Sequence, residues 1–188
     1  MHTDCVPVGG VHVTNDVARG LSTPLDDAER IKTLFGSAMP SPSDDREAIK
    51  VPRIGEDDGA ESGQVPRSML VGIIRPRLEE IFEMVRARLE MTGFAKVGGR
   101  RNVLTGGACQ LLGVPELAAM DLDQQTSVGR PRTVPGLAEA VSGPAFSTCA
   151  GLLGVGANAG AHIGANTTSR AYRPTEEPNG RLSRLGQW

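Results

Sequence analysis

The sequence predicts an α/β fold with a small inserted lobe, and three observations support this prediction. Short apolar segments with strand character alternate with segments in which apolar residues recur every three or four positions. A run rich in proline, glycine, serine and aspartate interrupts this alternation over residues 39–66. The 188-residue chain is 39% hydrophobic, enough for one domain with a real core, but only 3% aromatic, so aliphatic residues must form that core.

The first part of the chain is expected to hold a strand and two helices. Residues 5–8 are read as the end of a strand, with Gly9 and Gly10 as its turn. Apolar residues then recur at Val13, Val17 and Leu21, which predicts a short helix with capping residues at 14–16. A second helix is predicted with Thr23 as N-cap and Pro24 in its first position. Its expected inward face is formed by Leu25, Ala28, Ile31, Leu34 and Phe35.

Residues 39–100 are expected to form the inserted lobe. Residues 49–51 predict a short strand and residues 56–59 a hairpin tip, although a disordered linker is the alternative for 39–66. The longest helix follows, and Pro76 within it is expected to kink the helix or mark a restart. Its apolar positions step by three and four residues: Leu70, Ile74, Leu78, Ile81, Phe82, Val85 and Leu89.

The last part of the chain returns to alternating strands and helices. Strands are predicted at 102–105 and 126–129, with a helix at 114–120 between them. Pro144 is expected to open a final helix that ends at Leu153. Beyond it the chain is rich in Gly, Ala and Asn and then polar, which predicts a flexible linker over 156–179.

Composition excludes several classes of function. The net charge is −2 and no basic block is interleaved with aromatic residues, which argues against nucleic-acid binding. The three cysteines are widely spaced, so a disulfide framework is not expected and a reducing cytoplasm fits. The three histidines form no ligand cluster with them, and no signal-peptide or membrane-spanning pattern is found. No nucleophile–base set stands out, and Cys109 is expected to be a small buried residue.

A pair of glycines follows the predicted strand at 102–105. Gly106 and Gly107 come where the strand should end, and the small residue Ala108 follows. Glycine lets a ligand approach the main chain closely, and open α/β sheets bind ligands at the carboxyl ends of their strands. A ligand-binding turn and a turn that only reverses the chain are both compatible with this pattern.

Two further motifs are open to two readings. Glu29 and Lys32 share one helix face, where an exposed ion pair is the plain interpretation. Residues 180–188 form a basic segment that could lie in a membrane surface or be a frayed end. Its apolar positions are Leu182, Leu185 and Trp188.

Several segments, in this order, resemble the bacterial cell-division protein family FtsA, of the actin and heat-shock ATPase superfamily. They are 6–18 (VPVGGVHVTNDVA), 20–24 (GLSTP), 28–32 (AERIK), 73–82 (IIRPRLEEIF), 103–108 (VLTGGA) and 142–148 (SGPAFST). Each is short, but their order and spacing together are specific, and the resemblance covers roughly residues 3–155.

The resemblance implies the C-terminal actin-like (ribonuclease H-like) ATPase domain, incomplete, with a small inserted α+β lobe. The core would be 1–38 with 101–155, the lobe 39–100, the linker 156–179 and a partial membrane-targeting segment 180–188. In this family ATP, with Mg²⁺, lies between two domains. The adenosine contacts carry over to Gly106, Gly107, Ala108, Glu29 and Lys32.

The resemblance also implies partners. The lobe would dock the C-terminal peptide of the tubulin-like protein FtsZ, with Arg75, Arg77 and Glu80 as candidate contacts. Leu182, Leu185 and Trp188 would contact inner-membrane lipids. The intact protein would associate with other FtsA subunits and divisome proteins on the cytoplasmic face of the inner membrane at the division septum, while this chain alone is expected in the cytoplasm.

The sequence departs from the family pattern in lacking its first domain and both phosphate-binding hairpin loops. We therefore expect part of a longer protein, from a split or misassigned reading frame, that holds only the adenosine side of the cleft. On its own it should bind nucleotide weakly or not at all, hold no cofactor and catalyse no hydrolysis. The alternatives are a fragment of a sugar or carboxylate kinase of the superfamily, or a nucleotide-free interaction module.

Overall fold

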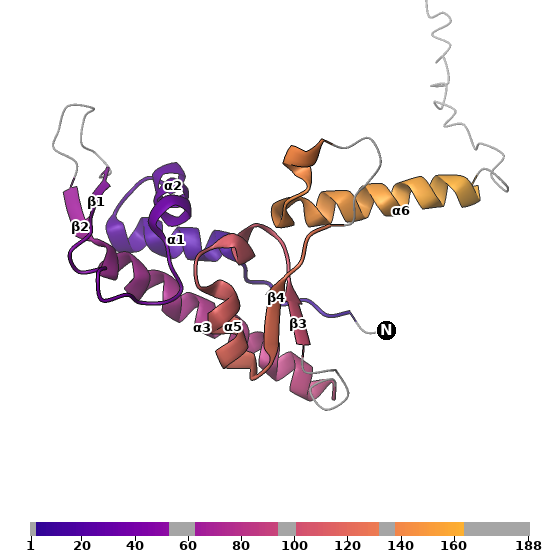
Figure 1. Ribbon diagram of the computed structural model, residues 1–188, viewed down its shortest axis with the longest axis horizontal. Helices are drawn as coiled ribbons and strands as arrows, with labels where there is room; N and C mark the ends of the chain where they lie inside the picture. The colour runs from indigo at the N-terminus through magenta and orange to yellow at the C-terminus, as the bar shows by residue number, and fades with distance from the viewer. Residues whose placement is uncertain (1–2, 53–62, 94–100, 132–137, 164–188) are drawn as a thin grey trace, which may run out of the picture. The chain divides into compact units, whose positions relative to one another are not determined.

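The computed structural model describes residues 3–52, 63–93, 101–131 and 138–163, with side chains described as far as residue 157. Within these ranges five α-helices accompany two sheets of two strands each (Figure 1), so the predicted mixture of helix and strand is confirmed. The chain divides into two units, Met1–Leu152 and Leu153–Trp188, and the first holds the elements described next.

Helix α1 (Gly10–Leu21) confirms the first predicted helix but begins earlier than expected. Because it starts at Gly10, Thr14 lies inside the helix and is not a cap. Val13 and Val17 are buried on one face, as their spacing predicted. The strand predicted at 5–8 is wrong, since residues 3–9 form no strand. A strand requires a neighbour to exchange backbone hydrogen bonds, and the strand pairs found in the described residues are formed by other segments.

Helix α2 (Leu25–Phe35) follows, one residue later than predicted. Pro24 takes the N-cap position, and the hydroxyl of Thr23 is buried without a hydrogen-bond partner among the described residues. Ala28 and Ile31 are buried, whereas Leu25 and Leu34 are 51% and 66% exposed, so the predicted inward face is too wide. At roughly 100° per residue, Leu25 and Leu34 fall on either side of the narrow sector that faces the core.

Strands β1 (Ala48–Val51) and β2 (Gly63–Pro66) pair antiparallel, which confirms the strand predicted at 49–51. The predicted hairpin tip at 56–59 lies outside the described residues. Shortly before β1, the buried carboxylate of Asp44 accepts a 3.0 Å bond from the Arg67 guanidinium and a 2.7 Å bond from the Ser41 amide. These bonds compensate for burial of the charge.

Helix α3 (Arg67–Met91) is the longest element and confirms the predicted long helix. Leu70, Ile74, Leu78 and Phe82 form its buried stripe. The helix continues through Pro76, so a restart there is wrong. A proline removes one backbone donor, and the buried residues on both sides of it hold the helix together.

Strand β3 (Arg101–Leu104), the 3₁₀ helix η1 (Gly107–Gln110), helix α5 (Val114–Leu122) and strand β4 (Gln125–Val128) form a β-α-β unit. The two strands are parallel, with Leu104 opposite Val128. Parallel strands need a crossover connection, and here α5 supplies it. The predicted strands and helix of this region are therefore confirmed, and Gly106 lies just beyond the carboxyl end of β3.

The chain then forms two 3₁₀ turns, η2 (Glu139–Val141) and η3 (Pro144–Phe146), before helix α6 (Ser147–Ile163). Pro144 thus opens a 3₁₀ turn, and the α-helix runs ten residues past the predicted end at Leu153. Residues 156–163 are helical where a flexible linker was expected, because this alanine-rich stretch contains no proline. The remaining linker and the segment 180–188 lie outside the described residues.

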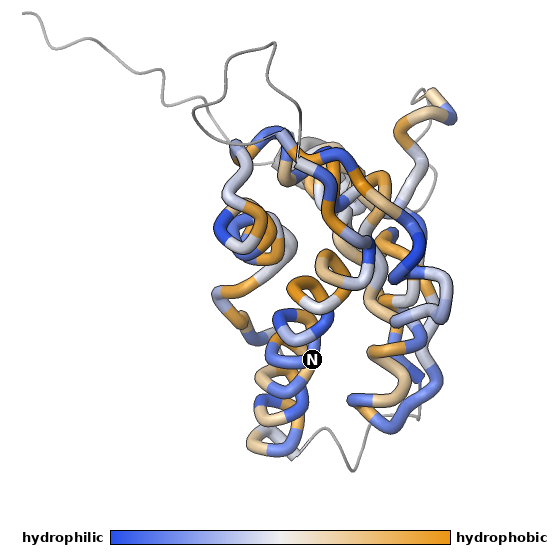
Figure 2. The backbone as a smooth tube through the Cα atoms, turned by 90° about the vertical axis from the view of Figure 1, so that its left-hand side faces the viewer, coloured by the Kyte–Doolittle hydropathy of each residue, from blue (hydrophilic) through white to orange (hydrophobic). Residues whose placement is uncertain are grey.

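One hydrophobic core joins α1, α2, α3, α5 and the β1–β2 hairpin. Figure 2 shows hydrophobic positions recurring along the helices between hydrophilic ones, as amphipathic helices require. Gly36, directly after α2, packs into this core: a Cβ there would lie 2.3 Å from the Lys32 carbonyl oxygen and 2.9 Å from both Ile74 Cδ1 and Leu111 Cδ1.

Gly36→Ala should therefore destabilise the protein by about 1–3 kcal/mol, because backbone and core must shift to admit the methyl group. Gly72→Ala is the matched control, since a Cβ at this helical position in α3 meets nothing within 4 Å. It should stabilise the chain by about 0.5–1 kcal/mol. Urea unfolding of the two variants measures both effects, and equal stabilities would contradict the packing described.

Candidate functional site

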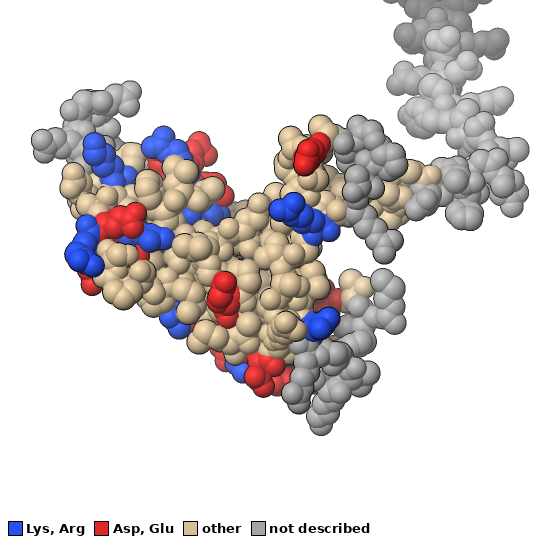
Figure 3. All heavy atoms as spheres, in the orientation of Figure 1, with Lys and Arg blue, Asp and Glu red and all other residues tan. Residues whose placement is uncertain are grey.

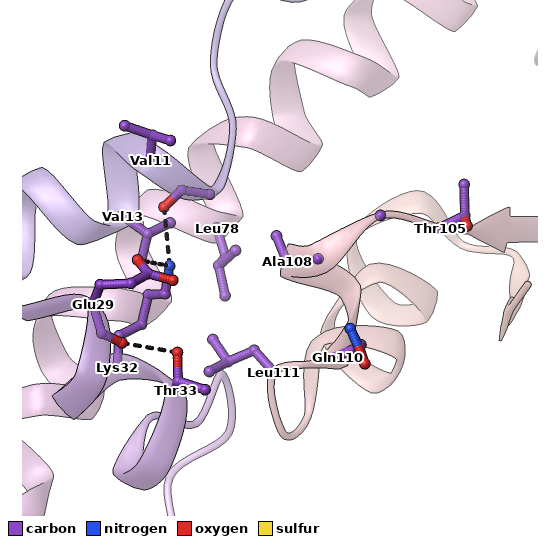
Figure 4. A pocket seen from close by; sticks show the side chains of 13 residues that line it. Val11, Val13, Glu29, Lys32, Thr33, Leu78, Thr105, Ala108, Gln110 and Leu111 are labelled. Carbon is purple, nitrogen blue, oxygen red and sulfur yellow. Dashed lines mark hydrogen bonds and ion pairs between the residues drawn. The ribbon is translucent and has the colours of Figure 1, made fainter. Parts of the chain in front are cut away.

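A cavity of about 630 Å³ lies between α1 and α2 on one side and the β3–η1 turn on the other (Figure 4). Leu78 of α3 lies behind it. The size suits a small ligand such as a nucleoside. Its lining comprises Gly10, Val11, Val13, Glu29, Lys32, Thr33, Leu78, Thr105, Gly106, Gly107, Ala108, Gln110 and Leu111.

The structure brings all five candidate cofactor-binding residues to this cavity. Gly106, Gly107 and Ala108 form one wall, while Glu29 and Lys32 of α2 line the opposite one. The two walls are more than seventy residues apart in the sequence, so only tertiary packing unites them.

The Gly106-Gly107 turn is held by hydrogen bonds on its outer side. The Gly106 amide donates to the Pro144 carbonyl at 3.0 Å, and the hydroxyls of Thr105 and Ser147 share a 2.5 Å bond. Gly106 has φ +96°, a conformation that favours glycine. Gly107 has no such constraint, and a Cβ there would meet nothing within 4 Å. The main chain at Gly107 is therefore open to close approach by a ligand.

Lys32 organises the opposite wall. Its ammonium group donates to Glu29 Oε2 at 2.6 Å, to Thr14 Oγ1 at 2.8 Å and to the Gly10 carbonyl oxygen at 3.4 Å. An ammonium group has three protons, so these three acceptors use all of them. The Lys32 side chain is only 12% exposed, whereas that of Glu29 is 54% exposed. The interpretation as a plain surface ion pair therefore does not describe Lys32.

The Glu29 carboxylate is held in its charged form. Burial is the largest single influence and raises its pKa, but hydrogen bonds from Lys32 and Thr14 and the Lys32 charge together outweigh it. The net effect lowers the pKa of Glu29 below its ordinary value of 4.5. Near neutral pH the cavity thus presents a carboxylate, which is an acceptor for ligand hydroxyl or amino groups.

Sequence reasoning missed Thr14, which it interpreted as part of a helix cap. The residue is 3% exposed and also donates to Glu29 Oε2 from its hydroxyl. A threonine spaced by four from Gly10 suggests back-bonding within a helix, but nothing local indicates a contact with another helix.

Other polar groups near the site have plain structural roles. Cys109 is buried, its thiol donates to the Gly106 carbonyl at 3.0 Å, and burial raises its pKa, as expected for a small packing residue. Asp121, which does not line the cavity, lies within α5, and burial and then Glu79 raise the pKa of its carboxyl. No group of three or more potential metal ligands occurs in the described part of the chain.

The candidate partner-binding residues lie elsewhere, on α3. Arg77 forms ion pairs with Asp16 of α1 and with Glu80, and Arg75 pairs with Glu79 at 2.7 Å. On the face drawn in Figure 3, basic and acidic side chains of the described residues are interspersed rather than gathered by sign. The candidate membrane residues Leu182, Leu185 and Trp188 are outside the described range.

No helix in the described ranges combines the length and apolar character needed to cross a membrane. Taken together, the fold and cavity define a mixed α/β domain with a nucleoside-sized pocket at the carboxyl end of a parallel strand.

Comparison with known proteins gives the family. The model of the family "Cell division protein FtsA" matches residues 1–151. The whole chain is 45% identical to the cell division protein FtsA of Agrobacterium fabrum, 36% identical to that of Neisseria meningitidis and 31% identical to that of Escherichia coli K12. It spans 42%, 44% and 45% of their lengths. The chain belongs to the FtsA family of cell division proteins, which confirms the resemblance seen in its motifs.

Loss of the Glu29 charge should change how stability depends on pH. Because the pKa of Glu29 is lower in the folded protein than its ordinary value of 4.5, the charged carboxylate stabilises the fold at pH values above 4.5. This stabilisation is lost as the pH falls through the pKa of the folded state. Wild type should be more stable than Glu29→Gln at pH 7, and the gap should narrow below pH 4.5.

Chemical denaturation across this pH range measures the gap. Glu83→Gln is the control, because this exposed residue of α3 enters none of the ion pairs found among the described residues. A gap for Glu29→Gln that does not vary with pH would contradict the network described.

Proposed function

We propose that this chain supplies the adenosine side of an ATP site in an FtsA-type, actin-like (ribonuclease H-like) protein. The observation that carries the proposal is the cavity in which Glu29 and Lys32 face the Gly106-Gly107 turn. The β3–α5–β4 unit supports it, since ligands bind beyond the carboxyl ends of strands in such sheets. The core would be residues 1–38 with 101–155, and the inserted lobe 39–100.

The chemistry of the lining fits an adenosine group. Val11, Val13 and Leu111 offer apolar surface to a base, Glu29 offers an acceptor to a ribose hydroxyl, and Gly107 leaves room beside the main chain. Lys32 is the one cation among the described lining residues, and its three protons already have acceptors. Phosphate groups and Mg²⁺ would therefore be held by parts of the longer protein.

This assignment makes the chain a binding component and not an enzyme. Phosphoryl transfer needs groups that position the phosphates and stabilise their charge. The described cavity directs none at a phosphate, which disfavours a sugar or carboxylate kinase. The apolar and acceptor groups of the cavity favour weak nucleotide binding, whereas a nucleotide-free interaction module would bind none.

The longer protein is proposed to form actin-like filaments through other FtsA subunits and to tether FtsZ to the inner membrane at the septum. Arg75, Arg77 and Glu80 are proposed to contact the FtsZ C-terminal peptide. Leu182, Leu185 and Trp188 are proposed to contact lipids on the cytoplasmic face, beside other divisome proteins.

Adenosine should bind the chain weakly, with a dissociation constant of about 1 mM, and ATP should bind no more than about threefold more tightly, because the described lining spares no cation for phosphate. Gly107→Val should abolish binding of both ligands by filling the cavity. NMR titration monitors the shifts of residues in the two cavity walls.

Gly72→Val is the matched control, because both glycines have an open Cβ position and only Gly107 lines the cavity. A chimera joins the chain to the N-terminal part of the Agrobacterium fabrum relative. It should bind ATP far more tightly than adenosine, and again only Gly107→Val should prevent this. The absence of shifts in the cavity walls at 10 mM adenosine (about ten times the expected dissociation constant) would refute the assignment.

Reversal of charge at Arg75 should weaken binding of an FtsZ C-terminal peptide to the chimera about tenfold or more, with little change in stability. Among the described residues Arg75 pairs only with Glu79 on its own helix, and such exposed pairs contribute about 0.5 kcal/mol or less. Arg77→Glu should also destabilise the fold, because it repels Asp16 across α1 and α3. Fluorescence anisotropy of a labelled FtsZ C-terminal peptide measures the affinity, with Arg86→Glu as the control for charge reversal on α3. An unaltered affinity in Arg75→Glu would exclude Arg75 from the contact with the peptide.

A further inference from the structure

Thr14 sits behind the cavity wall rather than in it. It is 3% exposed and is not among the residues that line the cavity. Its hydroxyl accepts a 2.8 Å bond from Lys32 and donates to Glu29 Oε2, and the Gly10 carbonyl oxygen lies 3.1 Å away as an alternative acceptor. One side chain of α1 thereby contacts both polar residues that α2 presents to the cavity.

The donors and acceptors of this cluster are closely matched. A threonine hydroxyl has one proton, so it donates to Glu29 or to the Gly10 carbonyl but not fully to both. Lys32 directs its three protons to Glu29, Thr14 and Gly10. Glu29 Oε2 therefore receives two donors, whereas Oε1 takes part in none of the hydrogen bonds found among the described residues. The neighbouring Thr33 hydroxyl donates to the Glu29 carbonyl oxygen at 2.8 Å and also helps to lower the pKa of the Glu29 carboxyl.

We propose that Thr14 is a positioning residue that, with Lys32, fixes Glu29 Oε2 and so leaves Oε1 to accept a hydrogen bond from a ribose hydroxyl. This inference rests on the proposed adenosine site. Lys32 has no proton to spare for the ligand, so recognition of the sugar falls to Glu29. Because a carboxylate on a flexible side chain loses rotamer freedom when it binds, prior fixation by Thr14 favours binding.

The Gly10 carbonyl gives the hydroxyl of Thr14 a second acceptor. When a ligand donates to Glu29 Oε1, Oε2 stays bonded to Thr14 and Lys32, and a small shift of the carboxylate is tolerated because Gly10 O, 3.1 Å from the Thr14 hydroxyl, is a second acceptor. The buried Thr14 hydroxyl therefore keeps an acceptor in the complex, and the free-energy cost of an unpaired buried donor does not oppose binding. The arrangement therefore predicts selectivity for ligands that carry the ribose hydroxyl.

The test compares Thr14→Val, which keeps the shape but removes the hydroxyl, with Thr14→Ser, which keeps the hydroxyl. NMR titration of the 188-residue chain uses adenosine, 2′-deoxyadenosine and 3′-deoxyadenosine. Wild type and Thr14→Ser should bind adenosine about tenfold more tightly than at least one deoxy analogue, as expected for a hydrogen bond to a carboxylate. In Thr14→Val this preference should fall to about threefold or less.

The pKa of Glu29, measured by NMR in the absence of ligand, gives a second readout. It should rise in Thr14→Val and stay unchanged in Thr14→Ser, because the Thr14 hydrogen bond helps to lower it. If Thr14→Val does not fold, Thr14→Ala removes the same hydroxyl and decides the question.

The outcomes separate the two proposals. If wild type binds none of the three nucleosides, the adenosine site and the role of Thr14 both fail. If wild type binds all three equally, or if Thr14→Val weakens all three by the same factor, the adenosine site stands and the positioning role is overturned. A selective loss of the preference for adenosine supports it.

Discussion

Burial of the apolar stripe of α3 is the constraint on which the rest of this structure depends. Leu70, Ile74, Leu78 and Phe82 are each almost fully buried, and α1, α2 and α5 pack against this one helix. One wall of the cavity packs on α3 through α1 and α2, the other is joined to it through α5, and Leu78 of α3 lines the cavity between them. Because α3 runs unbroken through Pro76, one continuous helix supports α1 and α2 on the side of Glu29 and α5, which follows the Gly106-Gly107 turn.

The polar groups beside the cavity form one small cluster of Lys32, Glu29 and Thr14. Lys32 is largely buried and uses its protons within the protein, whereas Glu29 is half exposed and keeps its charge. A buried ammonium group is tolerated only when its protons have acceptors, and Thr14, Glu29 and Gly10 provide them. The cation therefore stabilises the wall, and the carboxylate is the group offered to a ligand. This division of roles makes the cavity suited to a neutral, hydroxyl-bearing ligand.

Membership of the FtsA family gives this cavity its context. The chain covers less than half of the relatives' length, and we propose that its pocket and its two-stranded parallel sheet are parts of a larger assembly. Parallel sheets are normally covered on both faces, yet Val103 and Val128 are 66% and 41% exposed.

Apolar periodicity and ordered motifs are local signals, and they were enough to predict the helices α1, α2, α3 and α5, the strands β1, β3 and β4, and the family. Prediction failed where a neighbour decides the outcome: residues 5–8 pair with no strand among the described residues, and Leu25 and Leu34 fall outside the buried sector. It proposed Glu29, Lys32, Gly106 and Gly107 through family resemblance, but only the tertiary structure placed them around one cavity. No local signal indicated the contacts of Thr14 with Glu29 and Lys32, since they arise from the packing of α1 against α2.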